Sequence, residues 1–281
     1  MPDSSLPTHV AVVTGAGGTL CSTLCRDLAR RGYRVALLGR TLDKLEQLAH
    51  EIEAEGGIAR PFSVDVTDIP AVETVGKAVL EQLGPCRVLI NGAGGKLPGS
   101  VTTRTAYTPE ELDDASGITG FFNADLEIFR AEIDLNISGT VIPSQVFGKE
   151  MARVGGGSIV NFASMTSYRP LSRVAPYAAA KSAIVNYTQW LAAYLAPAKI
   201  RVNAIAPGFF INERNVKLLY DDEGQPSARG AQVLHHTPAG RFGEPHELLG
   251  TMNWLINDEQ SGFVTGITVP VDGGFLACPG T

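Results

Sequence analysis

The segment HVAVVTGAGGTLCS, residues 9–22, joins a run of β-branched residues to a glycine-rich turn and then to the start of an amphipathic stretch. The run 9–13 predicts a buried strand, and Leu20, Leu24 and Leu28 form one apolar helix face. Glycines let a backbone approach a pyrophosphate, which unpaired N–H groups at a helix N-terminus then stabilise. We therefore expect this segment to open a nucleotide-binding α/β fold.

The same alternation of short aliphatic runs and amphipathic stretches continues along the chain. Strands are predicted at 9–13, 34–38, 58–64, 87–90, 158–162, 200–205 and 267–271. Repeated strand–helix–strand units predict a parallel sheet with helices on both faces. The predicted fold is a single α/β domain over residues 1–281, a Rossmann-type doubly wound parallel sheet of about seven strands.

Composition excludes several classes of partner. With 281 residues, 44% of them hydrophobic, the chain is long enough for one large core. A net charge of -6 argues against a surface for nucleic acid or an anionic membrane. No stretch approaches the roughly 20 apolar residues of a membrane span, and residues 1–10 lack the features of a secretory signal. We expect a cytoplasmic protein.

The four cysteines are scattered along the chain, and two of them lie one helical turn apart. They are Cys21, Cys25, Cys86 and Cys278. We interpret all four as reduced packing residues, and we expect no metal site because paired ligand spacings are lacking.

Two long segments interrupt the alternation, residues 94–123 and residues 207–240. Each leaves from the carboxyl end of a predicted strand, where open α/β sheets bind ligands. Long irregular loops in compact domains tend to be functional. We therefore expect both segments to border the binding site.

Residues at the carboxyl ends of the predicted strands are candidates for holding a dinucleotide. The glycine turn contributes Thr14, Gly15, Gly17, Gly18, Thr19 and Leu20. Asp65 and Val66 follow the third strand, where Asp65 can accept from an adenine amino group, and Asn91, Gly92 and Ala93 follow the fourth. Small residues there would let the cofactor lie against the strand end.

Arg40 bears on the choice between NADP(H) and NAD(H). The second strand ends in Leu38-Gly39-Arg40, where NAD-preferring folds place an acidic residue. A guanidinium at this position can bind the 2′-phosphate through forked hydrogen bonds, so we expect NADP(H) in preference to NAD(H). The alternative is that Arg40 is a solvated residue at a helix entrance.

Tyr177 and Lys181 carry the strongest chemical signal. Their four-residue spacing in a helical stretch puts both side chains on one face. A neighbouring ammonium and a cationic nicotinamide would stabilise the phenolate, lower the phenol pKa from its usual value of about 10 and suit it to proton transfer. Ser164, after the fifth strand, and Asn136 would complete a catalytic set. Taken singly, a tyrosine and lysine at this spacing are common in ordinary amphipathic helices.

The ordered combination of these motifs resembles the short-chain dehydrogenase/reductase family over roughly residues 8–276. The resemblance implies that Tyr177 is the general acid/base, that Lys181 lowers its pKa and holds the nicotinamide ribose, and that Ser164 orients the carbonyl. Asn136 would anchor a relay water. Pro207, Gly208 and Phe210 would lie near the nicotinamide. The family also implies a homotetramer.

The glycine turn departs from the family pattern, because Thr19 and Cys21 stand where the second and third glycines are expected. Several stretches resemble the D-mannonate oxidoreductase (fructuronate reductase) branch of the family. They are residues 17–22 of the glycine turn and residues 91–95, 188–191, 206–210 and 237–243. That branch would reduce the ketone of D-fructuronate to D-mannonate. The resemblance also implies that residues 94–123 are an insertion capping the pocket, and we expect residues 207–240 to form a lid.

A sugar-acid substrate needs a cation for its carboxylate and polar groups for its hydroxyls. The candidates are Lys96, Arg173, Asn212 and Arg214, with Arg104 and Asn215 nearby in sequence. Each of these is alternatively a solvated surface residue.

Two other functions stay open at this point. The same catalytic set serves reductases of 3-oxoacyl chains or other apolar ketones, although the polar loop residues count against them. A non-catalytic NADP-binding regulator would keep the fold without turnover, but it predicts erosion of the set Asn136, Ser164, Tyr177 and Lys181. All four residues are present.

Overall fold

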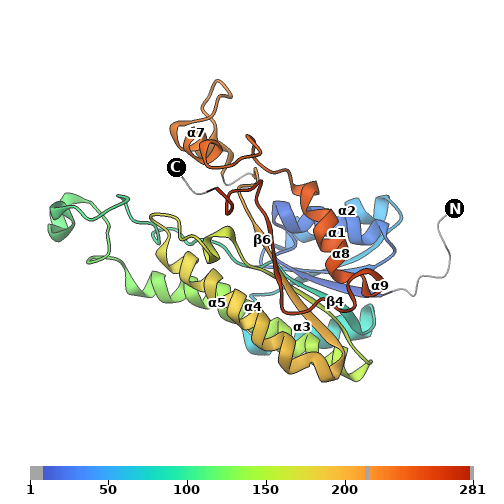
Figure 1. Cartoon of the computed structure of the whole chain (residues 1–281). Coiled ribbons are helices and arrows are strands. Elements are labelled where there is room, and N and C mark those ends of the chain that lie inside the picture. The colour runs from blue at the N-terminus through green and yellow to red at the C-terminus, as the bar shows by residue number, and fades with distance from the viewer. Residues whose placement is uncertain (1–8, 213–214, 279–281) are drawn as a thin grey trace.

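A seven-stranded parallel sheet forms the centre of the computed structural model, which describes residues 9–212 and 215–278 (Figure 1). The strands are β1 (Val10–Thr14), β2 (Arg34–Gly39), β3 (Ile58–Ser63), β4 (Cys86–Asn91), β5 (Gly157–Phe162), β6 (Ile200–Pro207) and β7 (Thr268–Val271). Their order is β3-β2-β1-β4-β5-β6-β7, and all neighbours are parallel. The predicted doubly wound sheet is confirmed.

Helices cover both faces of this sheet. The described helices are α1 (Thr19–Arg30), α2 (Leu42–Ala54), α3 (Ile69–Gln82), α4 (Leu126–Arg153), α5 (Ala175–Leu195), α6 (Val216–Leu219), α7 (Ala228–His235), α8 (Leu249–Ile256) and α9 (Asp258–Ser261), of which α6 and α7 pack apart from the two faces. Short 3₁₀ turns are η1 (Pro109–Leu112), η2 (Asp114–Ser116), η3 (Met165–Ser167), η4 (Ala196–Ala198) and η5 (Pro245–Leu248).

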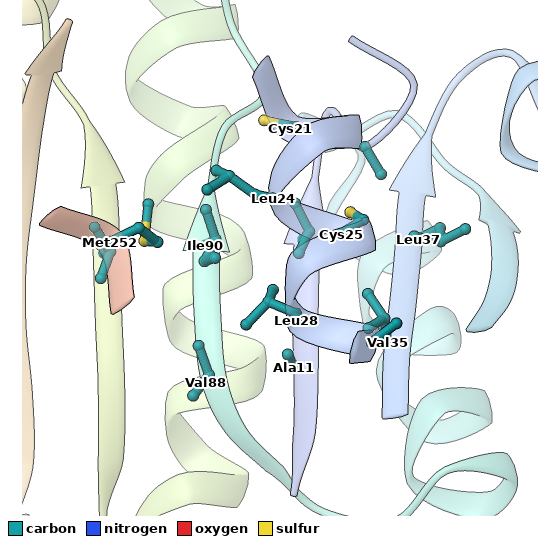
Figure 2. Packing of buried hydrophobic residues seen from close by; sticks show 14 of the residues in the cluster. Ala11, Cys21, Leu24, Cys25, Leu28, Val35, Leu37, Val88, Ile90 and Met252 are labelled. Carbon is teal, nitrogen blue, oxygen red and sulfur yellow. The ribbon is translucent and has the colours of Figure 1, made fainter. Parts of the chain in front are cut away.

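The core has two halves because side chains along a strand alternate between faces. Ala11 and Val13 of β1 pack under α1, α2 and α8, whereas Val10 and Val12 pack with α3, α4 and α5. In the first half, Leu24 and Leu28 lie over β1 between the side chains of β2 and β4, as predicted from their spacing (Figure 2).

The sheet reverses its strand order at β1, which pairs with β2 on one side and β4 on the other. Thr14 at the end of β1 is in register with Asn91 at the end of β4. Connections leave these two strands in opposite directions, so a crevice opens between their carboxyl ends. The candidate cofactor residues lie around this point.

The two segments predicted to be irregular differ from each other. Residues 94–123 contain the turns η1 and η2 and otherwise follow an irregular path away from the sheet (Figure 1). The expectation of an irregular 207–240 is wrong, because this segment contains α6 and α7. Their apolar residues Leu219 and Val233 bury against Phe242 in a small core of their own, which stabilises two short helices.

The cysteines and helices agree with a packed α/β core. Within the described residues, all four cysteines are free thiols; Cys21, Cys25 and Cys86 are buried and Cys278 is partly exposed. None of the described helices has the length and apolar character needed to cross a membrane.

Candidate active site

Tyr177 and Lys181 lie one turn apart at the start of α5, where Pro176 occupies the first turn of the helix. The Lys181 side chain is buried, at 4% exposure. Its Nζ donates a hydrogen bond to the Phe162 carbonyl at 2.7 Å and lies 5.8 Å from the centroid of the Tyr177 ring. The end of β5 therefore orients the lysine beside the phenol.

Ser164 reaches Tyr177 because the turn after β5 is anchored on α5. The Ser164 hydroxyl caps η3 by accepting from Thr166 N at 3.2 Å, and it is hydrogen-bonded to the Tyr177 phenol. Ser167 in the same turn donates to the Lys181 carbonyl at 2.7 Å. The structure thus brings together the three residues predicted as the reacting centre.

Asn136 is fully buried on α4 and holds the chain that follows β4. Its Oδ1 accepts from Gly95 N at 3.0 Å, and its Nδ2 donates to the carbonyls of Gly95 and Glu132. A Cβ on Gly94 would lie 2.6 Å from Asn136 Oδ1 and 3.3 Å from Lys181 Nζ. Asn136 and Lys181 therefore approach the same glycine, whose backbone must stay free of a side chain.

The electrostatics of the phenol differ from the expectation. Burial raises the pKa of Tyr177, the Ser164 hydrogen bond lowers it, and the Glu132 carboxylate raises it, with a net increase. Burial also lowers the pKa of Lys181 to about 8. In the chain alone the pKa of the phenol is therefore raised and not lowered, because burial outweighs the Ser164 hydrogen bond.

The glycine turn fits a dinucleotide pyrophosphate. Gly15 has φ +68°, and a Cβ there would lie 2.9 Å from the backbone of Ala93. Thr14 Oγ1 accepts from Ala93 N at 3.1 Å, so the turn is held against the end of β4. Gly18 is the N-cap of α1, and within the described residues no side chain caps this helix. The exposed first-turn N–H groups suit a phosphate.

Cys21 accounts for the irregular glycine spacing. A Cβ on Gly92 would lie 2.2 Å from Cys21 Sγ, so the thiol occupies the space over Gly92. Burial raises the pKa of Cys21 to about 12, which keeps the thiol neutral. The side chain where the family expects a glycine therefore points toward the end of β4.

Arg40 and Asp65 are neighbours at the ends of β2 and β3. Arg40 is exposed. Asp65 accepts from Thr67 N at 3.0 Å and from Thr67 Oγ1 at 2.7 Å, and these bonds, with a smaller contribution from Arg40, lower its pKa. Val66 is buried, and a Cβ on Gly139 of α4 would lie 2.9 Å from it.

The Asn91 side chain is buried at the end of β4. Its Nδ2 donates to Ser144 Oγ and to Asn161 Oδ1, both at 2.9 Å. Asn161 in turn donates to Thr188 Oγ1 at 2.9 Å. This buried chain of hydrogen bonds ties β4 and β5 to α4 and α5, so the Asn91 side chain braces the strand ends.

The end of β6 is held by close backbone contacts. Gly208 N donates to the Val271 carbonyl at 2.9 Å, directly after Pro207. Phe210 is buried, and a Cβ on Gly243 would lie 2.8 Å from its ring. The Phe210 side chain therefore packs against Gly243 and into the half of the core that contains α1 and α8.

Two of the predicted cations lie near each other, with a third that sequence reasoning missed. The pKa of Lys96 is lowered, mainly because the surrounding protein desolvates its ammonium. The positive charges of Arg229 and Arg173 also lower this pKa, whereas the carboxylate of Glu132 raises it. Arg173, at φ +76°, donates from Nε to the Thr102 carbonyl at 2.5 Å. Arg229 is on α7, far from the others in sequence.

The remaining substrate candidates have other surroundings. Asn215 donates to the Phe210 carbonyl at 2.7 Å and accepts from Asn212 N at 2.9 Å, so this pair shapes the turn before α6. Arg104 is exposed on the segment 94–123. Arg214 lies outside the described residues.

Sequence reasoning also missed Glu132, which is fully buried on α4 one turn before Asn136. Its Oε2 accepts from Leu97 N at 2.5 Å. The four-residue spacing from Asn136 was the available signal, but it does not reveal that the carboxylate is buried.

Known proteins are similar to this chain over almost its whole length. A family model described as short chain dehydrogenase matches residues 9–222. The uncharacterized oxidoreductase UxuB of Bacillus subtilis is 43% identical, covering 98% of both chains. Gluconate 5-dehydrogenase of Gluconobacter oxydans is 31% identical, covering 94% of this chain and 93% of the relative.

Solved structures agree with this assignment. A Haemophilus influenza structure with bound NAD, provisionally described as a D-mannonate oxidoreductase, has a TM-score of 0.93 and 39% identity, covering 98% of both chains. The similarity in sequence and in fold covers almost the whole chain. The chain belongs to the short-chain dehydrogenase family and is an NAD(P)-dependent oxidoreductase that acts on alcohol or ketone groups.

Proposed function

We propose that this enzyme reduces the ketone of a hexuronate-type sugar acid, such as D-fructuronate, to the secondary alcohol, here D-mannonate, with NADPH preferred. The observation that carries the proposal is that Arg173 and Arg229 both lower the pKa of Lys96, which follows directly on the stretch 94–95 held by Asn136 and approached by Lys181. The names of the D-mannonate and gluconate enzymes similar to this chain support the same substrate class.

The three cations come from three separate segments: the chain after β4, the turn before α5, and α7. Each of the two arginines lowers the pKa of Lys96, so the positive charges repel one another. A substrate carboxylate would relieve this repulsion and gain charge-assisted hydrogen bonds. Because Arg229 is on the segment 207–240, substrate binding would also draw this lid toward the site.

The residues at the centre suit carbonyl reduction. When bound, the cofactor supplies the hydride that adds to the carbonyl carbon. Tyr177 Oη donates its proton to the carbonyl oxygen, while Ser164 Oγ hydrogen-bonds that oxygen and orients it. A raised phenol pKa keeps Tyr177 protonated near neutrality, as a proton donor must be. The positive charge of Lys181 stabilises the phenolate that remains.

Arg40 supports the preference for NADPH. It is exposed beside Asp65 at the strand end that borders the adenosine side of the crevice. Position 39 is a glycine, so no carboxylate stands there to repel a 2′-phosphate. The guanidinium of Arg40 can bind that phosphate.

We also propose a cytoplasmic homotetramer. On α5, Trp190 and Tyr194 are 57% and 68% exposed, and their rings stack at 5.1 Å. Large aromatic side chains on a helix face are typical of a protein interface. Size-exclusion chromatography with light scattering would test the assembly, and a monomer would contradict it.

The substrate test is reductase activity at 340 nm with D-fructuronate, a neutral ketose and a short 3-oxoacyl ester. Arg229→Met should raise KM for D-fructuronate at least 10-fold and leave a neutral ketose unchanged, because it removes a carboxylate partner. Lys77→Met, on an exposed part of α3, is the matched control. Turnover confined to the 3-oxoacyl ester would overturn the substrate class, and cofactor binding without turnover of any ketone would indicate a regulator.

A further inference from the structure

Glu132 carries a buried carboxylate oxygen that the fold does not satisfy. The residue is fully buried, and its Oε1 has no hydrogen-bond partner among the residues that the structure describes. Its other oxygen, Oε2, accepts from Leu97 N at 2.5 Å. Leaving a buried acceptor unpaired costs about 1–3 kcal/mol, and more for a charged group, so a donor that arrives with a ligand has a ready acceptor here.

The electrostatic effects of the Glu132 carboxylate on two site residues indicate that it lies near the site. Its carboxylate raises the pKa of the Tyr177 phenol and that of the Lys96 ammonium. It therefore lies within electrostatic range of both, and its hydrogen bond to Leu97 N fixes it beside the residue that follows Lys96. Asn136, one turn away on the same helix, holds Gly95, so the two side chains of α4 border the same stretch of chain.

The charges of the three cations and of Glu132 favour different substrate groups. A substrate carboxylate is attracted by Lys96, Arg173 and Arg229 and repelled by Glu132. A hydroxyl has the opposite preference, because its proton can satisfy Oε1 without bringing a negative charge. A polyhydroxy keto acid therefore fits with its carboxylate at the cations and a hydroxyl near the ketone at Glu132.

We propose that Glu132 is a specificity-determining residue, whose free carboxylate oxygen accepts a hydrogen bond from a substrate hydroxyl next to the ketone. The inference rests on the proposed function and adds a requirement for a hydroxylated carbon beside the reacting centre. A site built to pair with a substrate hydroxyl rejects the analogue that lacks it by about 10⁴–10⁵-fold in favourable cases.

Glu132→Gln separates this role from the support of the chain after β4. The glutamine carbonyl oxygen still accepts from Leu97 N, whereas the amide nitrogen is a donor and offers no acceptor to a hydroxyl. Glu127→Gln is the matched control, because Glu127 lies on the same helix but is exposed and paired with Arg130.

The experiment measures kcat and KM for D-fructuronate and for its 1-deoxy and 3-deoxy analogues, with NADPH binding followed by fluorescence. The wild-type enzyme should prefer D-fructuronate over one of the analogues by at least 100-fold. In Glu132→Gln this ratio should fall at least 10-fold through loss of activity on D-fructuronate, with NADPH affinity and activity on that analogue kept within about 3-fold.

Three results would overturn the inference. The first is a wild-type enzyme that reduces D-fructuronate and both deoxy analogues equally. This result would come from the wild-type measurements alone. The second is a Glu132→Gln enzyme that loses activity on every ketone in the same proportion, which would make Glu132 a support for the loop. Both leave the proposed function standing. A wild-type enzyme active only on apolar ketones would overturn both proposals.

Discussion

The ammonium of Lys181 lies 5.8 Å from the centre of the Tyr177 ring while its Nζ donates to the Phe162 carbonyl at 2.7 Å. The Phe162 carbonyl at the end of β5 therefore holds the ammonium beside the phenol ring. In the proposed mechanism Tyr177 donates the proton and Lys181 stabilises the phenolate, so substitutions of the two residues test separate roles.

Tyr177→Phe should lower kcat by about 10³-fold and leave NADPH affinity within about 2-fold, because it removes the transferable proton and little volume. Steady-state rates at 340 nm and fluorescence titration of NADPH measure the two effects. Near-native kcat in this variant would mean that another group protonates the carbonyl oxygen.

Lys181 should make the free energy of unfolding rise with pH between about 8 and 10.5. Its folded-state pKa of about 8 lies below the usual 10.5, so the unfolded chain binds more protons in this interval and deprotonation favours the folded state, by about 1 kcal/mol per pH unit. Urea unfolding of wild type and Lys181→Met across pH 7–10 isolates this contribution. Equal slopes for the two proteins would contradict it, and Lys149→Met, an exposed lysine on α4, should match wild type.

Arg40→Asp should reverse the cofactor preference, lowering kcat/KM for NADPH relative to NADH at least 100-fold. The carboxylate repels a 2′-phosphate and accepts hydrogen bonds from a ribose hydroxyl. Lys149→Asp makes the same change of charge at a distance and should leave the ratio unaltered. An unchanged ratio in Arg40→Asp would show that this arginine does not contact the phosphate.

Gly92→Ala should raise the dissociation constant for NADPH at least 10-fold, because the new Cβ would lie 2.2 Å from Cys21 Sγ. The added Cys21→Gly substitution removes that atom and should restore much of the affinity. The four proteins form a double-mutant cycle, and the two substitutions should be strongly non-additive. Additive effects would mean that the thiol and the end of β4 are not in contact.

Asn161→Ala should lower the free energy of unfolding by about 3 kcal/mol, because it removes two buried hydrogen bonds, one from Asn91 Nδ2 and one to Thr188 Oγ1. Chemical denaturation measures the loss. Thr74→Ala removes a local, exposed hydrogen bond on α3 and should change stability by less than about 0.5 kcal/mol. A similar small loss for Asn161→Ala would mean that water replaces the missing partners.

Local sequence determined much of this protein. Periodicity alone located the seven strands to within two residues at most ends, because alternation along a strand and the spacing of Leu24 and Leu28 on a helix reflect which side faces the core. The four-residue spacing of Tyr177 and Lys181 likewise puts them on one helix face, since a turn of helix sets that relationship without help from the rest of the chain.

Only the tertiary structure decided how distant residues share the site. Arg229 of α7 influences Lys96 although the two are far apart in sequence, and Glu132 keeps one oxygen unpaired although Leu97 N pairs with the other. The rise in the Tyr177 pKa depends in the same way on burial and on that carboxylate. The burial and the electrostatic environment of a residue depend on all its neighbours in space, and the sheet brings these together from distant parts of the chain. The type of a residue and its spacing from others in the sequence do not reveal them.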